Sequence, residues 1–438
     1  MNKRHVSRRS FLVGAAMAAS GCATSGTERM AVAVAPGKIS ANEKINIAGI
    51  GVGGRGGSVL ENCEKHNIVA LCDVDWRRAA PTFRRHPNAN KYKDFRVMLD
   101  KEKDNIDAVI VATPDHVHAV ASLTAMQLGK HVYCEKPLTF CIDEARKMAE
   151  TARANQVATQ MGNGGQASVE SRVTCDYIWS GMLGPVREVH VWTNRPIWPQ
   201  GIDRPAETQP VPDTLDWDLW LGPAPERPFN QAYLPFKWRG WRDFGTGALG
   251  DMGCHAFHPI FRALKLGHPT SVEACSSNKE KPNKETFPLA EIVRYKFPAR
   301  GDMPPVDLTW YDGGMLPARP EGIEGDDPIG EGGTLYVGEK ASMMGHVVFP
   351  EAKRKELGRP PKMIERSPGH FEEWFNACKG GAPAGANFDI ASVVTQAVLL
   401  GNIAQFTRKR LDWDGEKITN VPAVNQYLGR EYRKGWEI

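Results

Sequence analysis

The first half of the chain carries short, nearly continuous runs of apolar residues, the pattern of strands buried on both faces of a parallel sheet. These runs cover residues 44–50, 68–72, 106–112 and 130–134. Between and after them, residues with helical spacing predict helices over 55–65, 119–128 and 141–154. Strands that alternate with helices predict an α/β fold with a doubly wound parallel sheet.

Beyond residue 160 the period changes, and apolar and polar residues alternate over several segments. The alternating segments cover 186–194, 271–276, 289–297, 306–311 and 334–337. This pattern predicts a C-terminal α+β domain whose open, mainly antiparallel sheet has one covered face. We expect late helices from His370 and over 390–407, and a surface loop over 317–333, which is rich in Gly, Pro and acidic residues. The predicted domains are 36–160 and 161–438.

Composition narrows the class of protein. The chain has 438 residues, 41% of them hydrophobic and 24% charged, and a net charge of +4, without the concentrated basic stripe that nucleic-acid binding needs. Nine cysteines show neither a CxxC pair nor metal-ligand spacing, so we expect no metal site. The eight cysteines after Cys22 fit buried free thiols better than a disulfide framework.

Tryptophan is unusually dense between residues 179 and 241. Seven of the 12 tryptophans lie there, at positions 179, 192, 198, 217, 220, 238 and 241. They could form a platform that stacks on sugars, or they could be core aromatics, and the sequence favours neither interpretation. Residues 196–240 combine Trp and Pro without a regular period, which predicts a long ordered loop over a functional cleft.

Residues 1–35 have the features of a signal peptide. Ser7-Arg8-Arg9-Ser10-Phe11-Leu12 matches the twin-arginine export signal, and the apolar run that follows is too short for a permanent membrane span. The stretch around Cys22 resembles a lipoprotein cleavage box, so a lipid anchor at Cys22 and cleavage after Ala35 are both open. The sequence therefore predicts twin-arginine export, to the periplasm or outside the cytoplasmic membrane, of a protein that is already folded.

A glycine-rich turn follows the first predicted strand. Gly51, Gly53 and Gly56, with Gly54 and Arg55 between them, fit the G-x-G-x-x-G fingerprint of a Rossmann dinucleotide-binding domain. Asp73 ends the second strand 20 positions beyond Gly53, where an acidic side chain meets the ribose hydroxyls and favours NAD over NADP. The neighbouring Arg77 and Arg78 leave NADP possible, and Asp73 could instead only cap the next element.

Two further motifs follow strands of the same predicted sheet. Thr113, Pro114 and His118 follow the third strand, and Glu135-Lys136-Pro137 follows the fourth. Ligands of open α/β sheets bind beyond the carboxyl ends of the strands, so Lys136 can hold an ammonium near a nicotinamide and a substrate oxygen. We include Thr113, Pro114, His118, Glu135 and Lys136 among the cofactor-binding candidates.

The order of these motifs resembles the glucose-fructose oxidoreductase / inositol dehydrogenase / MocA family, in particular its exported, twin-arginine members. In that family a D-x-x-x-H motif completes a Lys-Asp-His catalytic set, and Asp251 and His255 match it. On a helix this spacing would place both side chains on one face. The resemblance implies that Lys136, Asp251 and His255 are catalytic, that NAD is tightly bound, and that late helices return to the nucleotide domain.

The same resemblance implies a sugar or another polyol as substrate. The candidate substrate contacts are Asn163, Arg195, Trp198, Trp238, Arg239 and His258, although His258 could simply pack under the sheet. The exposed sheet face favours a homo-oligomer, a dimer or a tetramer.

The sequence thus predicts an NAD(P)-dependent oxidoreductase that transfers hydride between a sugar or cyclic polyol carbon and nicotinamide. One alternative is a redox-neutral glycoside hydrolase or lyase that acts through a transient keto-sugar. Glu135-Lys136-Pro137 weighs against that alternative, because glycosidases of this fold tend to lack it. A second alternative, a non-catalytic sugar-binding protein, would have no need of Lys136, Asp251 and His255 together.

Overall fold

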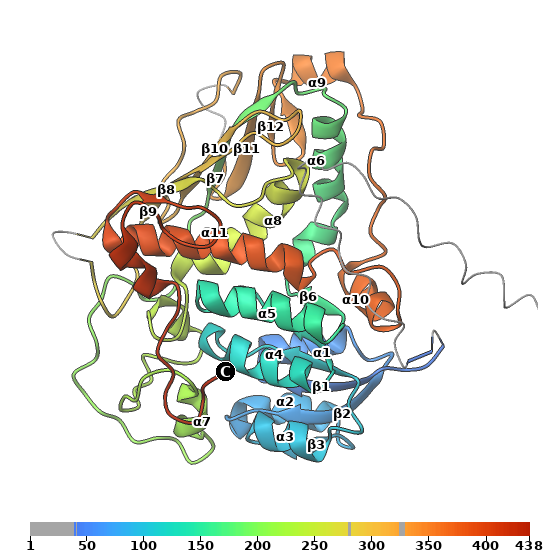
Figure 1. The fold of residues 1–438 in the computed structure, drawn as a ribbon, viewed down its shortest axis with the longest axis vertical. Helices are drawn as coiled ribbons and strands as arrows, with labels where there is room; N and C mark the ends of the chain where they lie inside the picture. Colours follow the sequence, from blue (N-terminus) through green and yellow to red (C-terminus); the bar gives the residue numbers. More distant parts are fainter. Residues whose placement is uncertain (1–38, 41, 279–281, 324–328) are drawn as a thin grey trace, which may run out of the picture. The chain divides into compact units, whose positions relative to one another are not determined.

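The computed structural model describes residues 39–438 except 41, 279–281 and 324–328 (Figure 1). The predicted signal peptide and Cys22 lie outside the described residues.

Six parallel strands form the first sheet, in the order β3-β2-β1-β4-β5-β6. The strands are β1 (Asn46–Ile50), β2 (Asn67–Cys72), β3 (Asn90–Tyr92), β4 (Ala108–Val111), β5 (His131–Cys134) and β6 (Thr159–Met161). The helices of this domain are α1 (Arg55–Glu61), α2 (Trp76–Arg85), α3 (Phe95–Lys101), α4 (His118–Gln127) and α5 (Ile142–Ala154). The doubly wound sheet is therefore confirmed, and its strand order reverses between β1 and β4, where such sheets bind ligands.

Eight strands form the second sheet, in the order β13-β12-β11-β7-β10-β9-β8-β14. They are β7 (Val186–Trp192), β8 (Ser271–Ser276), β9 (Glu291–Phe297), β10 (Val306–Tyr311), β11 (Gly333–Gly338), β12 (Ser342–Met344), β13 (Val347–Phe349) and β14 (Leu411–Asp412). Neighbouring strands are antiparallel except β7 and β10, which are parallel. The predicted mainly antiparallel sheet is confirmed, with one parallel pair in its centre.

One face of this sheet is covered by helices (Figure 1). Along β9, Val293, Tyr295 and Phe297 are buried, whereas Arg294 and Lys296 between them are exposed. The buried side chains pack with α6 (Val169–Trp179), α8 (Cys254–Ala263) and the second half of α11 (Phe388–Thr407) in one apolar core. The period-2 pattern of the sequence reflects this one-sided burial.

Two late helices pack on the nucleotide domain. Trp374 and Phe375 of α10 (His370–Cys378) pack in one core with residues of β1 and β5. Phe388 and Ala391, in the first turns of α11, join another core of the nucleotide domain. Although α11 is long and apolar enough to cross a membrane, most of its residues are buried inside this protein.

The loop over 196–240 is ordered and contains α7 (Trp217–Leu221). It has an apolar core of its own, in which Trp220, Tyr233 and Trp241 are buried with Phe244. Trp192 and Trp198 are buried as well. Most of the clustered tryptophans are thus core aromatics, which decides between the two interpretations that the sequence left open. Among the eight cysteines of the described region, seven are buried and all are free thiols.

Candidate active site

The turn after β1 can be built only with small residues. Gly51 has a φ of 77°, and a Cβ on it would lie 2.8 Å from the backbone of Ala112. A Cβ on Gly56 would lie 2.0 Å from the Gly51 carbonyl oxygen. The close approach of this turn to the end of β4 leaves room for a ligand above the sheet, which is the role that the fingerprint predicts.

Asp73 holds the turn and faces the space above it. Its carboxylate accepts hydrogen bonds from the backbone N–H groups of Gly53 (2.8 Å) and Asp75 (2.9 Å). Burial raises the pKa of Asp73 to about 6, against the effect of these two hydrogen bonds. Asp73 thus caps the turn and still lines the pocket, so its structural and ligand-binding roles are compatible.

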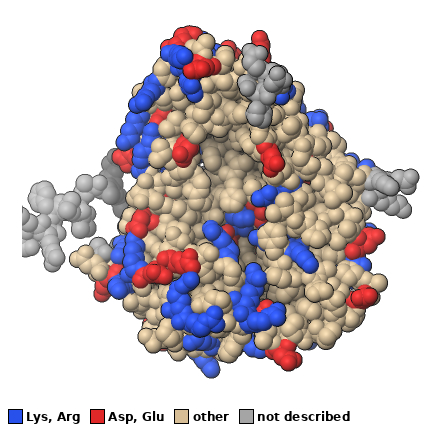
Figure 2. Space-filling view, turned by 180° about the vertical axis from the view of Figure 1, so that it is seen from behind, with Lys and Arg blue, Asp and Glu red and all other residues tan. Residues whose placement is uncertain are grey.

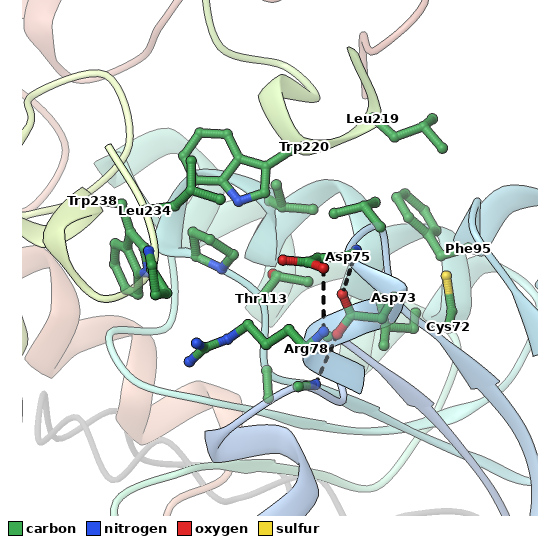
Figure 3. A pocket seen from close by; sticks show the side chains of 18 of the residues that line it. Cys72, Asp73, Asp75, Arg78, Phe95, Thr113, Leu219, Trp220, Leu234 and Trp238 are labelled. Carbon is green, nitrogen blue, oxygen red and sulfur yellow. Dashed lines mark hydrogen bonds between the residues drawn. The ribbon is translucent and has the colours of Figure 1, made fainter. Parts of the chain in front are cut away.

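A cavity of about 360 Å³ lies above the carboxyl ends of β1, β2 and β4 (Figure 3). Of the predicted cofactor residues, Gly51, Gly53, Arg55, Asp73, Thr113 and Pro114 line it. Its other walls come from distant segments: α7 and the rest of the long loop supply Leu219, Trp220, Leu234, Phe236 and Trp238, and the end of the chain supplies Trp436. A glycine cradle, a buried carboxylate and apolar walls fit a dinucleotide.

The remaining predicted cofactor residues support the pocket without lining it. The ring nitrogens of His118 face the carbonyl oxygens of Pro137 (2.7 Å) and Thr113 (2.9 Å), so His118 ties the loop after β4 to the loop after β5. Glu135 accepts a hydrogen bond from Arg55 Nε at 2.8 Å. A Cβ on Gly162 would lie 2.7 Å from the Glu135 carboxylate, which explains the glycine there.

Lys136 and Asp251 meet although they are 115 positions apart. Lys136 Nζ donates to Asp251 Oδ1 at 2.7 Å and to the Asp251 carbonyl oxygen at 3.1 Å. Arg239 Nε donates to the same Oδ1 at 2.8 Å. Burial opposes ionisation of Asp251, but the two cations outweigh it and hold the pKa of Asp251 below its usual value. Asp251 is therefore a carboxylate that fixes two cations.

His255 lies beside this ion pair as a neutral imidazole. Burial, with Lys136 as the next contribution, lowers the pKa of His255 to about 4, against the opposite effect of Asp251. The His255 ring makes no hydrogen bond with any residue in the described part of the chain. The structure thus brings the three predicted catalytic residues together, with His255 free to accept a proton and Asp251 bound to Lys136 rather than to the ring.

A buried acid beneath this group was missed by the sequence analysis. Asp115, after β4, accepts a hydrogen bond from Thr246 Oγ1 at 2.8 Å, and its other oxygen has no partner in the described structure. Burial, with Asp251 as the next contribution, raises the pKa of Asp115 to about 7. The sequence does carry a signal for it, because Asp115 follows a strand and lies between the candidate residues Pro114 and His118.

The predicted substrate residues separate into two groups. Trp238 and Arg239 line the pocket, and the Arg239 guanidinium lies 4.2 Å from the centre of the Trp238 ring. Asn163 and His258 are buried and hydrogen-bond each other at 3.2 Å. His258 also bonds the Gly385 carbonyl at 3.1 Å. Asn163 and His258 are therefore bound to each other and to neighbouring backbone outside the described cavity, and their contact with a substrate stays a prediction.

Arg195 and Trp198 do not reach the described cavity either. Arg195 Nη1 donates to Asn194 Oδ1 at 2.9 Å, beyond the end of β7. The buried Trp198 donates its indole N–H to Gln200 Oε1 at 2.7 Å and packs edge-on against Phe236. Trp198 therefore packs against Phe236 and lies near Arg239 without lining the cavity itself.

Comparison with known proteins identifies the family of both domains. Residues 44–163 match the NAD-binding Rossmann fold of the Gfo/Idh/MocA oxidoreductase family, and residues 180–296 match that family's C-terminal α/β domain. The chain carries both domains of the Gfo/Idh/MocA oxidoreductase family. Its nucleotide domain is therefore an NAD-binding domain.

Individual relatives match this chain over only part of their own length. A glycosyl hydrolase family 109 protein of Saccharopolyspora erythraea is 31% identical over 71% of this chain and 63% of its own. A D-glucoside 3-dehydrogenase of Escherichia coli is 30% identical over 29% of this chain and 35% of its own. The matched regions thus span less than two thirds of either relative.

Among solved structures, the fold resembles that of the WlbA dehydrogenase of Bordetella pertussis, which was determined with NADH and UDP-GlcNAcA. The TM-score is 0.58 at 16% identity, with 85% of this chain and 99% of that chain covered. At this identity the likeness shows the shared fold alone.

Proposed function

We propose that this protein is an NAD-dependent oxidoreductase that acts on a hydroxyl-bearing carbon of a sugar or cyclic polyol. The observation that carries the proposal is the Lys136–Asp251 ion pair beside a neutral His255, close to the NAD pocket. An ammonium can hold the substrate oxygen, and a neutral imidazole can take its proton. Asp251 orients Lys136 and Arg239 and stays ionised.

The chain's own residues divide the work of the reaction. The substrate hydroxyl donates a hydrogen bond to His255, which accepts the proton as the carbonyl forms. Lys136 Nζ, fixed by two oxygens of Asp251, stabilises the developing negative charge on the substrate oxygen. Bound NAD supplies the acceptor for the hydride that leaves the same carbon.

A sugar or polyol is the substrate class that the surroundings favour. Trp238 and Arg239 offer an aromatic face and a guanidinium at the pocket. The names of the related D-glucoside 3-dehydrogenase and glycosyl hydrolase also point to sugars. The carboxylates of Asp73 and Asp75 at the ribose end favour NAD, because they would repel a 2′-phosphate, although Arg78 lies beside them.

The test uses the purified protein, its extracted nucleotide and a panel of sugars and glycosides. We expect the extracted nucleotide to be NAD. We also expect at least one sugar to reduce it to NADH, which is measured by its near-ultraviolet absorbance. A protein that binds NAD but reduces none of it with any sugar, and releases no aglycone, would contradict the proposed activity.

A second function is supported by the relative that matches the longest stretch among those described, a glycosyl hydrolase family 109 protein. In this reaction bound NAD+ would accept a hydride from the glycoside while His255 accepted the hydroxyl proton, and the aglycone would then leave by elimination. Water would add to the resulting double bond, and the NADH would return its hydride to the keto-sugar. Release of aglycone without net NADH would identify this reaction. Lasting NADH would identify a dehydrogenase instead.

We further propose that the chain is exported by the twin-arginine route to the periplasm. The support is the Arg8-Arg9 motif of the leader, and a lipid anchor at Cys22 would tether the protein to the membrane. Antibody detection in cell fractions, with Arg8 and Arg9 both changed to Lys as the control, tests this. We also propose a homo-oligomer that pairs through the uncovered sheet face, which light scattering of the purified protein can test.

A further inference from the structure

We propose that Trp436 and the chain segment 430–438 close the adenosine end of the NAD pocket and set the rate at which the dinucleotide leaves. This inference goes beyond the proposed reaction and rests only on the assignment of the pocket to NAD. Trp436 lines the same cavity as Asp73 and Gly53, although 363 positions separate it from Asp73.

The position of Trp436 is fixed by contacts with the nucleotide domain. Its ring lies 6.0 Å from that of Phe95, at the start of α3, and the Arg96 guanidinium lies 4.1 Å from its centre. Arg96 Nη1 also donates to the Gly435 carbonyl at 3.3 Å. Trp436 is buried and belongs to the apolar core of the nucleotide domain. It is therefore part of the pocket wall rather than a loose end.

A second set of contacts fixes the segment to α7, which lines the pocket through Leu219 and Trp220. Arg433 donates to the Gly222 carbonyl at 2.9 Å, to Asp218 Oδ1 at 2.6 Å and to the Asp218 carbonyl at 2.7 Å. The Arg433 N–H also bonds the Pro223 carbonyl at 3.2 Å. The segment thus links α7, which carries the wall residues Leu219 and Trp220, to α3.

The start of the segment is anchored close to the catalytic loops. Arg430 bonds the His116 carbonyl at 2.6 Å and pairs with the buried Glu144 at 2.6 Å. Tyr432 donates to the same Glu144 at 2.8 Å. From Arg430 to Trp436 the chain is therefore bound at each end, and its aromatic ring closes the apolar end of the cavity.

The chemistry at this end of the pocket fits adenine. The apolar residues that line the pocket include Cys72, Val74, Phe95, Val117, Leu219 and Trp436, and the Trp436 ring contacts that of Phe95. In Figure 3, Phe95, Leu219 and Cys72 gather at one end of the pocket, while Trp238 lies at the other end and Asp73 and Asp75 between them. An aromatic face stabilises a stacked base. Because α7 and segment 430–438 are bound together, we expect adenine to leave faster when one of them detaches.

The first experiment follows nucleotide release in wild type, Trp436→Ala and the control Trp179→Ala. Trp179 is a partly buried tryptophan whose indole bonds the Ala263 carbonyl in the other domain. Protein loaded with NADH is mixed with excess NAD, and the loss of bound-NADH fluorescence is recorded. We expect release to be about tenfold faster in Trp436→Ala, since stacking on a base is worth ~1–3 kcal/mol, and unchanged in Trp179→Ala.

A second experiment needs no variant that could fail to fold. Hydrogen exchange of the wild-type protein is compared with and without NAD, and we expect slower exchange in 430–438 when NAD is bound. Equal release rates for wild type and Trp436→Ala, or unchanged exchange in 430–438, would overturn the closure while leaving the pocket assignment intact. A wild-type protein that binds no dinucleotide would overturn both.

Discussion

At the scale of single residues, the polar part of the site converges on one oxygen, Asp251 Oδ1. Lys136 and Arg239 both donate to it, at 2.7 and 2.8 Å, and His255 lies beside them without a hydrogen bond in the described structure. An arrangement in which one buried anion fixes two cations leaves the imidazole as the group that can accept a proton. Lys136 and His255 therefore have separate roles.

Lys136→Ala tests that separation. We expect turnover to fall by about 100-fold or more, because the ammonium stabilises charge only as the reaction proceeds. Dinucleotide affinity should stay within about threefold, since Lys136 does not line the cavity. Sugar-dependent NADH formation and a fluorescence titration with NAD give the two quantities, with the exposed Lys65→Ala as control. Activity that survives in Lys136→Ala would show that the catalytic assignment is wrong.

Asp115 is expected to reduce stability at alkaline pH. Its pKa is raised to about 7 in the folded protein, mainly by burial, so the folded state binds its proton more tightly than the unfolded state. The resulting stability is present at acid pH and is lost as the pH rises through about 7. Asp115→Asn should therefore lose less stability than wild type between about pH 5.5 and pH 8.5, by about 2 kcal/mol.

Urea unfolding of the two proteins at both pH values measures this difference. The side-chain oxygen of Asn can still accept the hydrogen bond from Thr246, so the substitution changes charge more than packing. An equal loss of stability in both proteins would mean that Asp115 does not titrate in this range.

Residue roles were predictable where a residue sits at the end of a strand. Asp73 and Lys136 both follow parallel strands, and chain position alone put them beside the pocket. The roles of Arg239 and Asp115 depend on contacts with residues 12 and 131 positions away, which no local pattern encodes. The burial of Asn163 could not be predicted, because a polar side chain in a motif gives no sign of whether it is buried.

At the scale of elements, the turn that carries Asp251 is a π-helix, η5 (Leu249–Gly253), which leads into α8. The wider turn leaves the Asp251 carbonyl available to Lys136, and π-turns of this kind are frequent at functional sites. Gly250 permits it, because a Cβ there would lie 2.1 Å from Thr246 Oγ1. The same Thr246 holds Asp115.

Gly250→Ala should therefore disturb both stability and activity. The added methyl must displace Thr246, at a cost of ~1–3 kcal/mol in unfolding free energy, and turnover should fall because Asp251 moves. Gly267→Ala is the matched control, since a Cβ there has nothing within 4 Å. Chemical unfolding and NADH formation measure the two effects. A Gly250→Ala protein as stable and active as the control would show that the turn tolerates side chains.

Elements were predictable where the apolar pattern is strong and long. The strands and helices that were predicted between 44 and 154, and α11, lie within a few residues of their positions in the structure. Among the elements that were missed are α2, α3, α6 and the three-residue strand β3. In α2, Pro81 and several arginines obscure the helical pattern. Alternation gives no direction of pairing, so the parallel contact between β7 and β10 could not be inferred.

At the scale of the whole molecule, basic side chains surround the site while neutral histidines are buried through the fold. Figure 2 shows Lys and Arg gathered around a hollow on one face. The NAD pocket and a second cavity that shares Asp75 and Arg78 with it are lined by the basic residues Arg55, Arg77, Arg78, Lys93, Lys237 and Arg239. Burial is the largest cause that lowers the pKa of seven histidines to about 3 or 4: His66, His116, His118, His131, His255, His258 and His370.

These histidines should make the protein sensitive to mild acid. Their folded-state pKa values lie below the value of about 6.5 for an unfolded chain, so the unfolded state binds more protons as the pH falls from about 6.5 to 4. The contribution of these neutral histidines to the free energy of unfolding is therefore fully present above about pH 6.5 and is lost as the pH falls below it. The raised pKa values of Asp73, Asp115 and Asp312 act in the opposite direction, but these acids are fewer.

His131 isolates one contribution to this loss. Its Nδ1 accepts the Ala158 N–H at 2.9 Å, so protonation of that nitrogen breaks the hydrogen bond. In His131→Gln the amide oxygen can accept the same N–H at any pH. Between about pH 7 and pH 5 the variant should lose about 2 kcal/mol less unfolding free energy than wild type. Urea unfolding at both pH values measures this loss. An equal loss in His131→Gln and wild type would mean that His131 keeps its ordinary pKa despite its burial.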